Sequence, residues 1–184
     1  MQFRPSTLQD IEEMTGIAND AVLYLKEHNI NQWQKGYPTR DNLLSDLDKG
    51  IGYVAEDRGR LVALCAVTFE EEAAYSALRG AGWLTEGNNY AVVHRMCVAA
   101  DCHGLGYPAL MFDAIETLVL ERGAESVRID THPENFLMQR TISKAGFTCC
   151  GEILVLGTPE AGETRLAYEK LLPVRSEEAA CGTI

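Results

Sequence analysis

The 184-residue chain lacks several features that mark special classes of protein. No apolar run approaches the roughly 18 residues of a membrane span, and the opening segment MQFRPSTLQD has no apolar core typical of an export signal. There is no internal repeat and no low-complexity segment. Basic residues are few, 16 against 27 acidic ones, which gives a formal charge of −11. Because this charge repels phosphates, we expect no nucleic-acid or membrane partner. The lack of an export signal in a chain with six cysteines leads us to expect a cytoplasmic location.

The six cysteines show none of the spacings typical of a metal site or a disulfide framework. No C-x-x-C or H-x-x-x-H pattern is present. Cys149 and Cys150 are adjacent, so on a strand their side chains would point to opposite faces. Without an export signal, reduced thiols are expected. We therefore expect no metal cofactor.

Hydrophobic residues make up 46% of the chain and charged residues 23%, which is typical of one globular domain with a sizeable core. We place this domain at 1–172 and expect a frayed tail over 173–184. Periodicity and capping signals predict the element order βααβββαβαββ. The predicted strands are 2–4, 51–56, 60–69, 90–99, 125–131, 147–156 and 163–171. The predicted helices are about 6–29, 39–50, 107–122 and 134–145, and 70–89 is a loop with room for one helical turn.

This order predicts a mixed α/β fold around one sheet. Residues 90–99 form a nearly continuous apolar run, which is typical of a central strand that is buried on both faces. A helix connects this strand to 125–131, so the fourth and fifth predicted strands should be parallel and joined by a right-handed crossover. The remaining strands are expected to be mostly antiparallel.

A strand end, a glycine-rich turn and a helix start follow one another between Val98 and Leu110. Gly104 and Gly106 allow a sharp turn that brings several backbone N–H groups toward one point. Pro108 suits the first helical turn, where its missing N–H costs nothing. Free amides at a helix N-terminus favour an anion, most naturally a diphosphate. A plain tight turn without a ligand is the structural alternative.

A dinucleotide site is one interpretation of this turn. Gly104-x-Gly106-x-x-Ala109 matches the pattern G-x-G-x-x-A, and Asp130 lies at a strand end about 20 residues further on. However, the spacer over 99–103 is long for that fingerprint. Only one helix and two strands follow Asp130, too few for a doubly wound sheet. A dinucleotide-dependent oxidoreductase is therefore the weaker alternative.

Residues 90–156 resemble the central motif of the GNAT acetyltransferases. The sequence HGLGYP at 103–108 is similar to the family's Q/R-x-x-G-x-G/A loop, and MCVAAD at 96–101 resembles the approach L-x-V-x-P-x. Asn135 and the sequence KAGF at 144–147 resemble the helix and turn that follow in the family. The resemblance implies a mostly antiparallel sheet with one parallel pair, a fourth and a fifth strand that splay apart, and helices on both faces.

The resemblance also implies an N-acetyltransferase that uses acetyl-CoA as its co-substrate. The acceptor is the primary amine of a small molecule or peptide, which attacks directly in a ternary complex. The backbone amide of Cys97 would polarise the thioester carbonyl. A homodimer is left open. The residues implied in coenzyme binding are Met96, Cys97, Val98, His103, Gly104, Leu105, Gly106, Tyr107, Pro108, Ala109 and Asn135.

Three positions depart from the family pattern. His103 stands where Gln or Arg is usual, and Pro108 stands where Gly or Ala is usual, which removes one amide from the anion site. Residue 142 is Ile where a general-acid tyrosine is frequent, so no residue is assigned to protonate the leaving thiolate. These departures keep open a non-catalytic acyl-CoA-binding module.

His94 is the candidate general base. A primary alkyl amine has a pKa near 10, so only about one molecule in 10³ is neutral at pH 7 and a base must take the proton. His94 lies on the strand leading to the thioester, and its ordinary pKa suits the task. A core histidine bonded to a backbone carbonyl is the alternative. Cys97 as an acyl-carrying nucleophile has no evident base beside it.

The acceptor pocket has three candidate residues. Trp33 and Tyr37 lie in the loop where the family usually builds this pocket, and a core plug between two helices is the alternative. Glu86 in the loop before the central strand is the second candidate base, and a solvated acid is its alternative. The acidic run at 70–72 is expected to be solvated.

Overall fold

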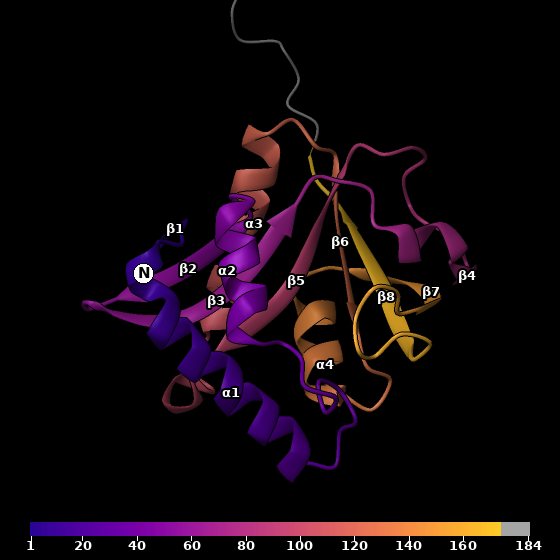
Figure 1. Cartoon of the computed structure of the whole chain (residues 1–184). Helices are drawn as coiled ribbons and strands as arrows, with labels where there is room; N and C mark the ends of the chain where they lie inside the picture. The colour runs from indigo at the N-terminus through magenta and orange to yellow at the C-terminus, as the bar shows by residue number, and fades with distance from the viewer. Residues whose placement is uncertain (174–184) are drawn as a thin grey trace, which may run out of the picture.

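The computed structural model describes residues 1–173, in which helices cover both faces of one eight-stranded sheet (Figure 1). The strands lie in the order β1-β2-β3-β5-β6-β8-β7-β4. They are β1 (Gln2–Pro5), β2 (Gly52–Asp57), β3 (Arg60–Thr68), β4 (Arg79–Gly80), β5 (Tyr90–Val98), β6 (Ser126–Thr131), β7 (Thr148–Leu154) and β8 (Thr164–Leu171). The α-helices are α1 (Ile11–Glu27), α2 (Arg40–Asp48), α3 (Tyr107–Glu121) and α4 (Phe136–Lys144). Short 3₁₀ turns are η1 (Leu8–Asp10), η2 (Ala73–Ala77) and η3 (Ala100–Cys102).

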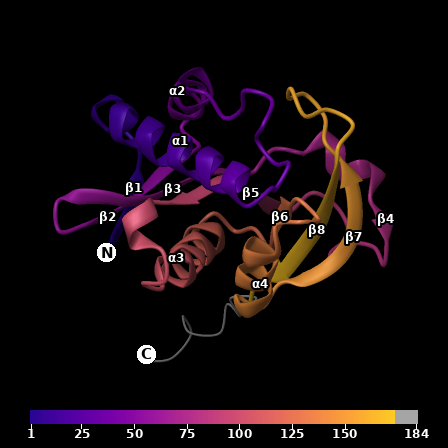
Figure 2. The same cartoon turned by 90° about the horizontal axis from the view of Figure 1, so that it is seen from below.

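The helices divide between the two faces of the sheet. Figure 2 shows α1 and α2 on one face and α3 and α4 on the other. Ile11 and Met14 of α1, and Met111 and Ile115 of α3, are each at most 1% exposed and pack into the core cluster. Burying each such side chain contributes about 1.5–3 kcal/mol. The expected fold class, a mixed and mostly antiparallel sheet between helices, is confirmed. Within residues 1–173 no helix has the length and apolar character needed to cross a membrane.

The parallel ladder between β5 and β6 is short. It runs only from the pair Tyr90–Ser126 to the pair Val93–Ile129. Beyond this point β5 continues to Val98 against β3 alone, and β6 continues to Thr131 against β8 alone. The fourth and fifth predicted strands are therefore parallel, as expected, and then separate. In the described chain, the separation leaves each of these two strands with one edge that pairs with no strand.

A bulge at Arg95 marks the part of β5 that has left β6. Leu64 of β3 faces Cys97 but Ala66 faces His94, so β5 holds an extra residue there. Arg95 has a φ of 52°, a left-handed conformation that costs a non-glycine residue about 1–3 kcal/mol. Bulges of this kind bend a strand and redirect its side chains. The burial of β5 changes at the bulge. Tyr90–Val93 are buried, as expected for a central strand, whereas residues 94–96 are only half-buried.

The segment 70–89 is more ordered than the sequence indicates. It contains η2 and the two-residue strand β4, which pairs with Glu152 and Gly151 of β7. The strand was missed because two residues carry no periodicity. Trp83 of this segment packs on Arg128, whose guanidinium carbon lies 4.1 Å from the ring centre of Trp83 and 3.7 Å from that of Tyr90 in β5.

Candidate functional site

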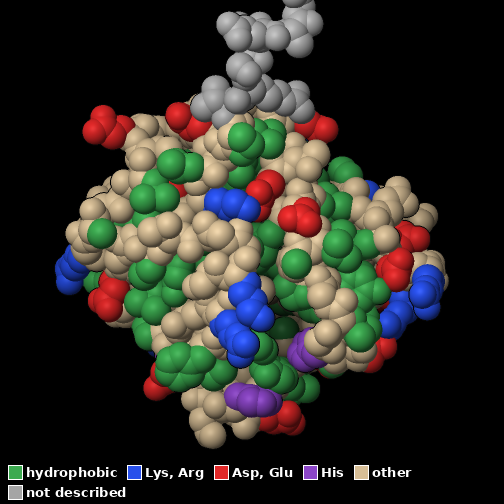
Figure 3. Space-filling model, turned by 180° about the vertical axis from the view of Figure 1, so that it is seen from behind, with side chains coloured by type: hydrophobic (Ala, Val, Ile, Leu, Met, Phe, Trp, Pro, Cys, Tyr) green, Lys and Arg blue, Asp and Glu red, His purple; other side chains and the backbone are tan. Residues whose placement is uncertain are grey.

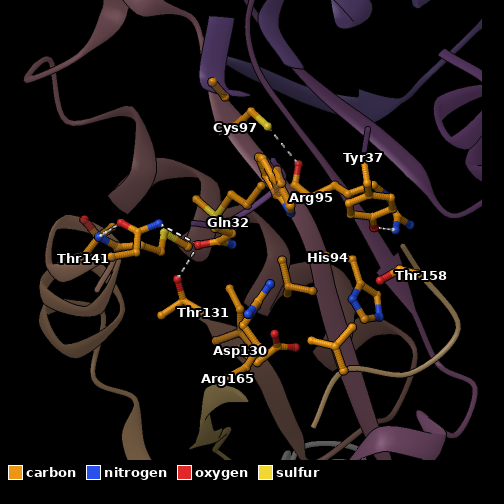
Figure 4. Close-up of a pocket in the computed structure, with 18 of the residues that line it drawn as sticks. Gln32, Tyr37, His94, Arg95, Cys97, Asp130, Thr131, Thr141, Thr158 and Arg165 are labelled. Atoms are coloured by element: carbon orange, nitrogen blue, oxygen red, sulfur yellow. Dashed lines mark hydrogen bonds between the residues drawn. The ribbon is translucent and has the colours of Figure 1, made fainter. Parts of the chain in front are cut away.

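A cavity of about 1080 Å³ opens where β5 and β6 separate. Its walls come from α1, the 30–38 loop, α2, η2, β5, the start of α3, β6, α4, the loop between β7 and β8, and the start of β8. Figure 4 shows side chains from the 30–38 loop, β5, β6, α4, the β7–β8 loop and β8 gathered around one space. Those labelled are Gln32, Tyr37, His94, Arg95, Cys97, Asp130, Thr131, Thr141, Thr158 and Arg165.

The glycine-rich turn lies at one end of this cavity. Gly104 and Gly106 have φ values of 80° and 84°, and a Cβ at either position would meet nothing within 4 Å. Both glycines therefore combine a left-handed backbone with open space in front of it. In the described chain, the backbone N–H groups of Gly104, Gly106 and Tyr107 donate to no backbone or side-chain acceptor. Such a turn at a helix N-terminus fits a diphosphate.

The structure divides the residues of the expected coenzyme loop into two groups. His103, Gly104, Gly106, Pro108 and Ala109 line the cavity, as do Met96, Cys97, Val98 and Asn135. Two side chains of the loop do not. The Leu105 side chain is 65% exposed, and the Tyr107 hydroxyl donates to Asp57 Oδ2 at 2.8 Å. At these two positions the backbone alone could contact a ligand.

His103 is held beside the turn. Its Nε2 lies 3.3 Å from the carbonyl oxygen of Val98, and its ring meets the edge of Tyr24 with the ring centres 5.2 Å apart. Figure 3 views the face that carries α3 and α4, where Lys and Arg side chains lie near a hollow with histidine beside it.

The Cys97 side chain is buried. Its Sγ contacts the carbonyl oxygen of Arg95 at 3.4 Å. Burial raises the pKa of the Cys97 thiol to about 12, so the sulfur is protonated at neutral pH. A protonated buried thiol is a poor nucleophile, which disfavours an acyl-carrying cysteine. Within residues 1–173, no group of three His, Cys, Asp or Glu side chains is placed to hold a metal ion.

Trp33 and Tyr37 both line the cavity, on the side of α1 and α2. Their rings meet edge to face with the centres 6.4 Å apart. Tyr37 accepts a 2.5 Å hydrogen bond from Arg95 Nη1, and burial raises the pKa of its hydroxyl. The main-chain N–H of Trp33 donates to the Glu160 carboxylate, which joins the 30–38 loop to the loop before β8.

Glu86 is placed elsewhere. It is exposed and does not line the cavity. Its loop is held toward β8, because Glu169 accepts hydrogen bonds from the Leu84 N–H at 2.5 Å and from the Thr85 hydroxyl at 2.6 Å. A role for Glu86 at the acceptor therefore has no support from its position.

His94 lies on the cavity wall with its side chain 22% exposed. Its Nε2 is 3.5 Å from Glu72 Oε2. Burial, with a smaller contribution from the positive charge of Arg95, lowers the pKa of His94 to about 3. The imidazole is therefore neutral at pH 7. A group with so low a pKa gains little free energy by accepting a proton, which makes it a weak base for an amine.

Asp130 is a site residue whose place the sequence did not reveal. Its Oδ1 accepts a hydrogen bond from the Tyr75 hydroxyl at 2.9 Å, and burial raises the pKa of its carboxyl to about 6. The sequence offered it only as a ribose ligand in the dinucleotide interpretation. That interpretation is wrong, since the described sheet holds one parallel pair and no doubly wound arrangement.

Gln32 and Arg165 also reach the cavity without any signal in the sequence. Gln32 Oε1 accepts from Asn135 Nδ2 at 3.0 Å, and Asn135 in turn caps α4 by accepting from the Met138 N–H at 3.1 Å. Arg165 is buried in an ion pair with Glu160 at 2.6 Å. The contact between Gln32 and Asn135 joins segments 103 residues apart, so only the folded chain brings these two side chains together.

The comparisons with known proteins fit this geometry. The model of the acetyltransferase (GNAT) family matches residues 19–147, well over half of the chain. The chain belongs to the GNAT acetyltransferase family. No curated protein matches the chain at a significant level.

Solved GNAT structures are similar to this chain along almost its whole length. A GNAT-family acetyltransferase from Streptococcus agalactiae has 28% sequence identity and a TM-score of 0.82, with 94% of this chain and 95% of that chain covered. The ribosomal-protein-alanine N-acetyltransferase from Brucella melitensis has 20% identity and a TM-score of 0.67, with 94% and 100% covered. The yncA protein from Salmonella typhimurium, solved with its cofactor acetyl-CoA, has 16% identity and a TM-score of 0.67, with 98% of both chains covered. The last two share the fold.

Proposed function

We propose that this GNAT chain transfers the acetyl group of acetyl-CoA to the primary amine of a small molecule or peptide. The observation that carries the proposal is the separation of β5 from β6 directly after the pair Val93–Ile129, with the glycine-rich turn at the open end of the gap. Such a gap can take an extended chain that ends in a reactive group. The expected site residues around it, Met96–Val98, His103–Ala109 and Asn135, are proposed as the coenzyme ligands.

The diphosphate is proposed to bind the free N–H groups of Gly104, Gly106 and Tyr107. From there the pantetheine arm would follow the unpaired edge of β5, along Val98, Cys97 and Met96. A ligand can bind such an edge as an added strand, because the backbone groups there lack a partner. From Val98 to Val93 the strand covers roughly 16 Å, so a ligand that follows this edge ends near the apex of the gap.

Acetyl-CoA supplies a thioester, whose carbonyl carbon an amine can attack directly. The backbone N–H of Cys97 is proposed to donate to the carbonyl oxygen and stabilise the negative charge that develops there. Trp33 and Tyr37 are proposed to wall the acceptor side. No covalent enzyme intermediate is needed, which agrees with the raised pKa of the Cys97 thiol.

No residue is assigned to protonate the leaving thiolate. Ile142, at the position where the family often has tyrosine, is fully buried in the core. A thiol has an ordinary pKa of about 8.5, so the thiolate is a moderate leaving group that can take a proton from the amine or from water. The same position favours a second candidate function, a module that binds acyl-CoA without catalysis.

A panel of amines with acetyl-CoA tests the proposal. We expect CoA release and acetylated product by mass spectrometry, with initial-velocity lines that intersect when both substrates are varied. Parallel lines with an isolable acetyl-enzyme would contradict direct attack. A thermal shift with acetyl-CoA but no transfer to any amine would support the binding module instead.

A further inference from the structure

Asp130 and His94 occupy equivalent places on the two strands that separate. Val93 and Ile129 are the last facing pair of the parallel ladder, and His94 and Asp130 are the next residues of β5 and β6. Both line the cavity, and Figure 4 shows them on neighbouring walls. A reactive group at the apex of the gap would lie beside both side chains.

We propose that the Asp130 carboxylate is the general base that takes the proton of the acceptor amine, and that the Tyr75 hydroxyl is its positioning residue. This inference rests on the proposed function, because it assigns a role in the same acetyl transfer.

The hydrogen bond from Tyr75 fixes the carboxylate of Asp130. It engages Oδ1 at 2.9 Å, which leaves Oδ2 available to a ligand in the cavity. Tyr75 is only 2% exposed and packs against Trp83, with the ring centres 5.0 Å apart. The donor is therefore itself held in place, and a base fixed in one orientation needs little reorganisation when a proton reaches it.

The charged groups around Asp130 leave its carboxylate without a direct cationic partner in the described chain. Glu72 and Tyr75 face it from the η2 segment, Glu160 from the loop before β8, and Arg165 from β8. Arg165 already contacts Glu160 at 2.6 Å and Glu163 at 3.3 Å. An ammonium group entering the cavity would supply the missing positive charge.

The proton affinities favour Asp130 over His94. Burial raises the pKa of Asp130 to about 6, so the group is ionised above that pH and yet more basic than an ordinary carboxylate. The pKa of His94 is lowered to about 3. His94 would then line the cavity as a neutral side chain near the reacting atoms and would not accept the proton.

The ammonium nitrogen gives one proton to Asp130 Oδ2 and becomes neutral. Its lone pair forms the C–N bond to the thioester carbonyl carbon, and the C–S bond breaks with its electron pair on sulfur. The nitrogen loses a second proton, which the thiolate takes. Asp130 then releases its proton to solvent, and the products are the acetylated amine and free CoA.

The test compares Asp130→Asn with Tyr75→Phe and with the matched control His94→Gln, using an amine that the wild type acetylates. The profile of kcat/KM for the amine reports groups of the free enzyme and of the free amine. For the wild type we expect an acidic limb near pH 6 from Asp130 and a separate limb near 10 from the amine. Asp130→Asn should lower kcat at pH 7.5 by about 10²–10³-fold, lose the limb near pH 6, and recover at high pH where the amine is neutral. His94→Gln should keep that limb.

Tyr75→Phe separates positioning from a purely structural role. It should lower kcat by roughly tenfold or less and move the acidic limb, while the KM for acetyl-CoA stays within about twofold. The thermal shift produced by acetyl-CoA should be equal in wild type and Asp130→Asn, which shows that the variant is folded. In ¹³C NMR of carboxyl-labelled aspartate, one resonance should titrate near pH 6 in the wild type and be missing in Asp130→Asn.

Three results would overturn the inference. The first is an Asp130→Asn variant that retains the acidic limb and activity within tenfold of the wild type. The second is loss of that limb in His94→Gln. The third is a wild type that binds acetyl-CoA but acetylates no amine, which contradicts the proposed function as well. The first two results overturn the base assignment and leave the acetyl transfer standing.

Discussion

Arg95 donates two hydrogen bonds to Asp46, from Nε at 2.7 Å and from Nη2 at 2.6 Å. The arginine stands on the bulge of β5 and the aspartate on α2, so the pair holds the strained backbone against a helix. A third hydrogen bond joins Arg95 to Tyr37. The bulge, α2 and the acceptor-side loop are thus tied through one guanidinium group.

Removing the negative charge of Asp46 should lower the stability of the folded protein. The Arg95 and Asp46 side chains are 13% and 8% exposed, and taking away one partner of a buried pair costs about 3–5 kcal/mol because the other charge is left unpaired. We expect Asp46→Asn to lose that much stability in urea unfolding. The control is Glu12→Gln, which breaks the exposed pair of Glu12 with Arg40 and should cost under about 1 kcal/mol. Equal losses in the two variants would refute the role assigned to Asp46.

The turn before α3 should be needed for the coenzyme rather than for folding. Gly106 and Gly123 stand at opposite ends of α3 with φ values of 84° and 78°, both in open space. Alanine at either position should cost about 1–2 kcal/mol of stability, since both are left-handed. Only Gly106→Ala should also weaken acetyl-CoA binding, by roughly 5–30-fold in calorimetry, because it disturbs the amides of the turn. A similar loss of affinity in Gly123→Ala would place the diphosphate elsewhere.

Acid should act on stability through His94 and Asp130 with opposite signs. The pKa of His94 is about 3 in the folded protein, so between that pH and about 6.5 only the unfolded chain binds the proton. The neutral, buried His94 therefore contributes to the free energy of unfolding above pH 6.5. This contribution is lost as the pH falls, by about 2 kcal/mol from pH 7 to 5. Asp130, with a raised pKa of about 6, gains its proton first in the folded state and adds about 1 kcal/mol at pH 5.

Chemical unfolding at pH 7 and pH 5 checks both signs. His94→Gln should lose less stability than the wild type between these two pH values, and Asp130→Asn should lose more. If the two variants moved in the same direction, one of the two pKa shifts would be assigned with the wrong sign.

The segment 81–89 should depend on Glu169. This fully buried carboxylate accepts from Ser126 at 2.6 Å and from Arg128 at 2.9 Å, as well as from the Leu84 and Thr85 groups of the segment. Glu169→Gln removes the charge that Arg128 needs, so we expect a loss of about 3–5 kcal/mol. Amide exchange in 81–89 should become faster. Exposed Glu152→Gln on β7 is the control and should stay within about 0.5 kcal/mol of the wild type.

The sequence indicated the parts of this molecule that depend on local pattern. The apolar run of β5, the glycines before α3 and the crossover to β6 predicted a parallel pair with an anion-binding turn beside it, and the structure has that pair. The predicted helix over 39–50 likewise agrees with α2, where Thr39 accepts from the Asn42 N–H. Periodicity and capping act within a few residues, so the sequence alone suffices for them.

The remaining features depend on contacts between distant segments. The local sequence around Arg95 does not indicate a left-handed backbone, since the residues that bind its side chain, Asp46 and Tyr37, are 49 and 58 residues away. Asp130 is set apart from other acids only by the burial and the Tyr75 hydroxyl that the fold supplies. The sequence likewise does not show that Glu86 lies outside the cavity, because the position of its loop is set by hydrogen bonds to Glu169, a residue 83 positions further along the chain.

A crystal structure grown with acetyl-CoA tests the central claim most directly. We predict density for the diphosphate at the amides of Gly104, Gly106 and Tyr107, and for the pantetheine arm along the β5 edge at Met96–Val98, with the thioester near the side chain of Asp130. Density for the coenzyme away from this gap, or a ladder between β5 and β6 that continues past Val93 and Ile129 and closes the gap, would contradict the account.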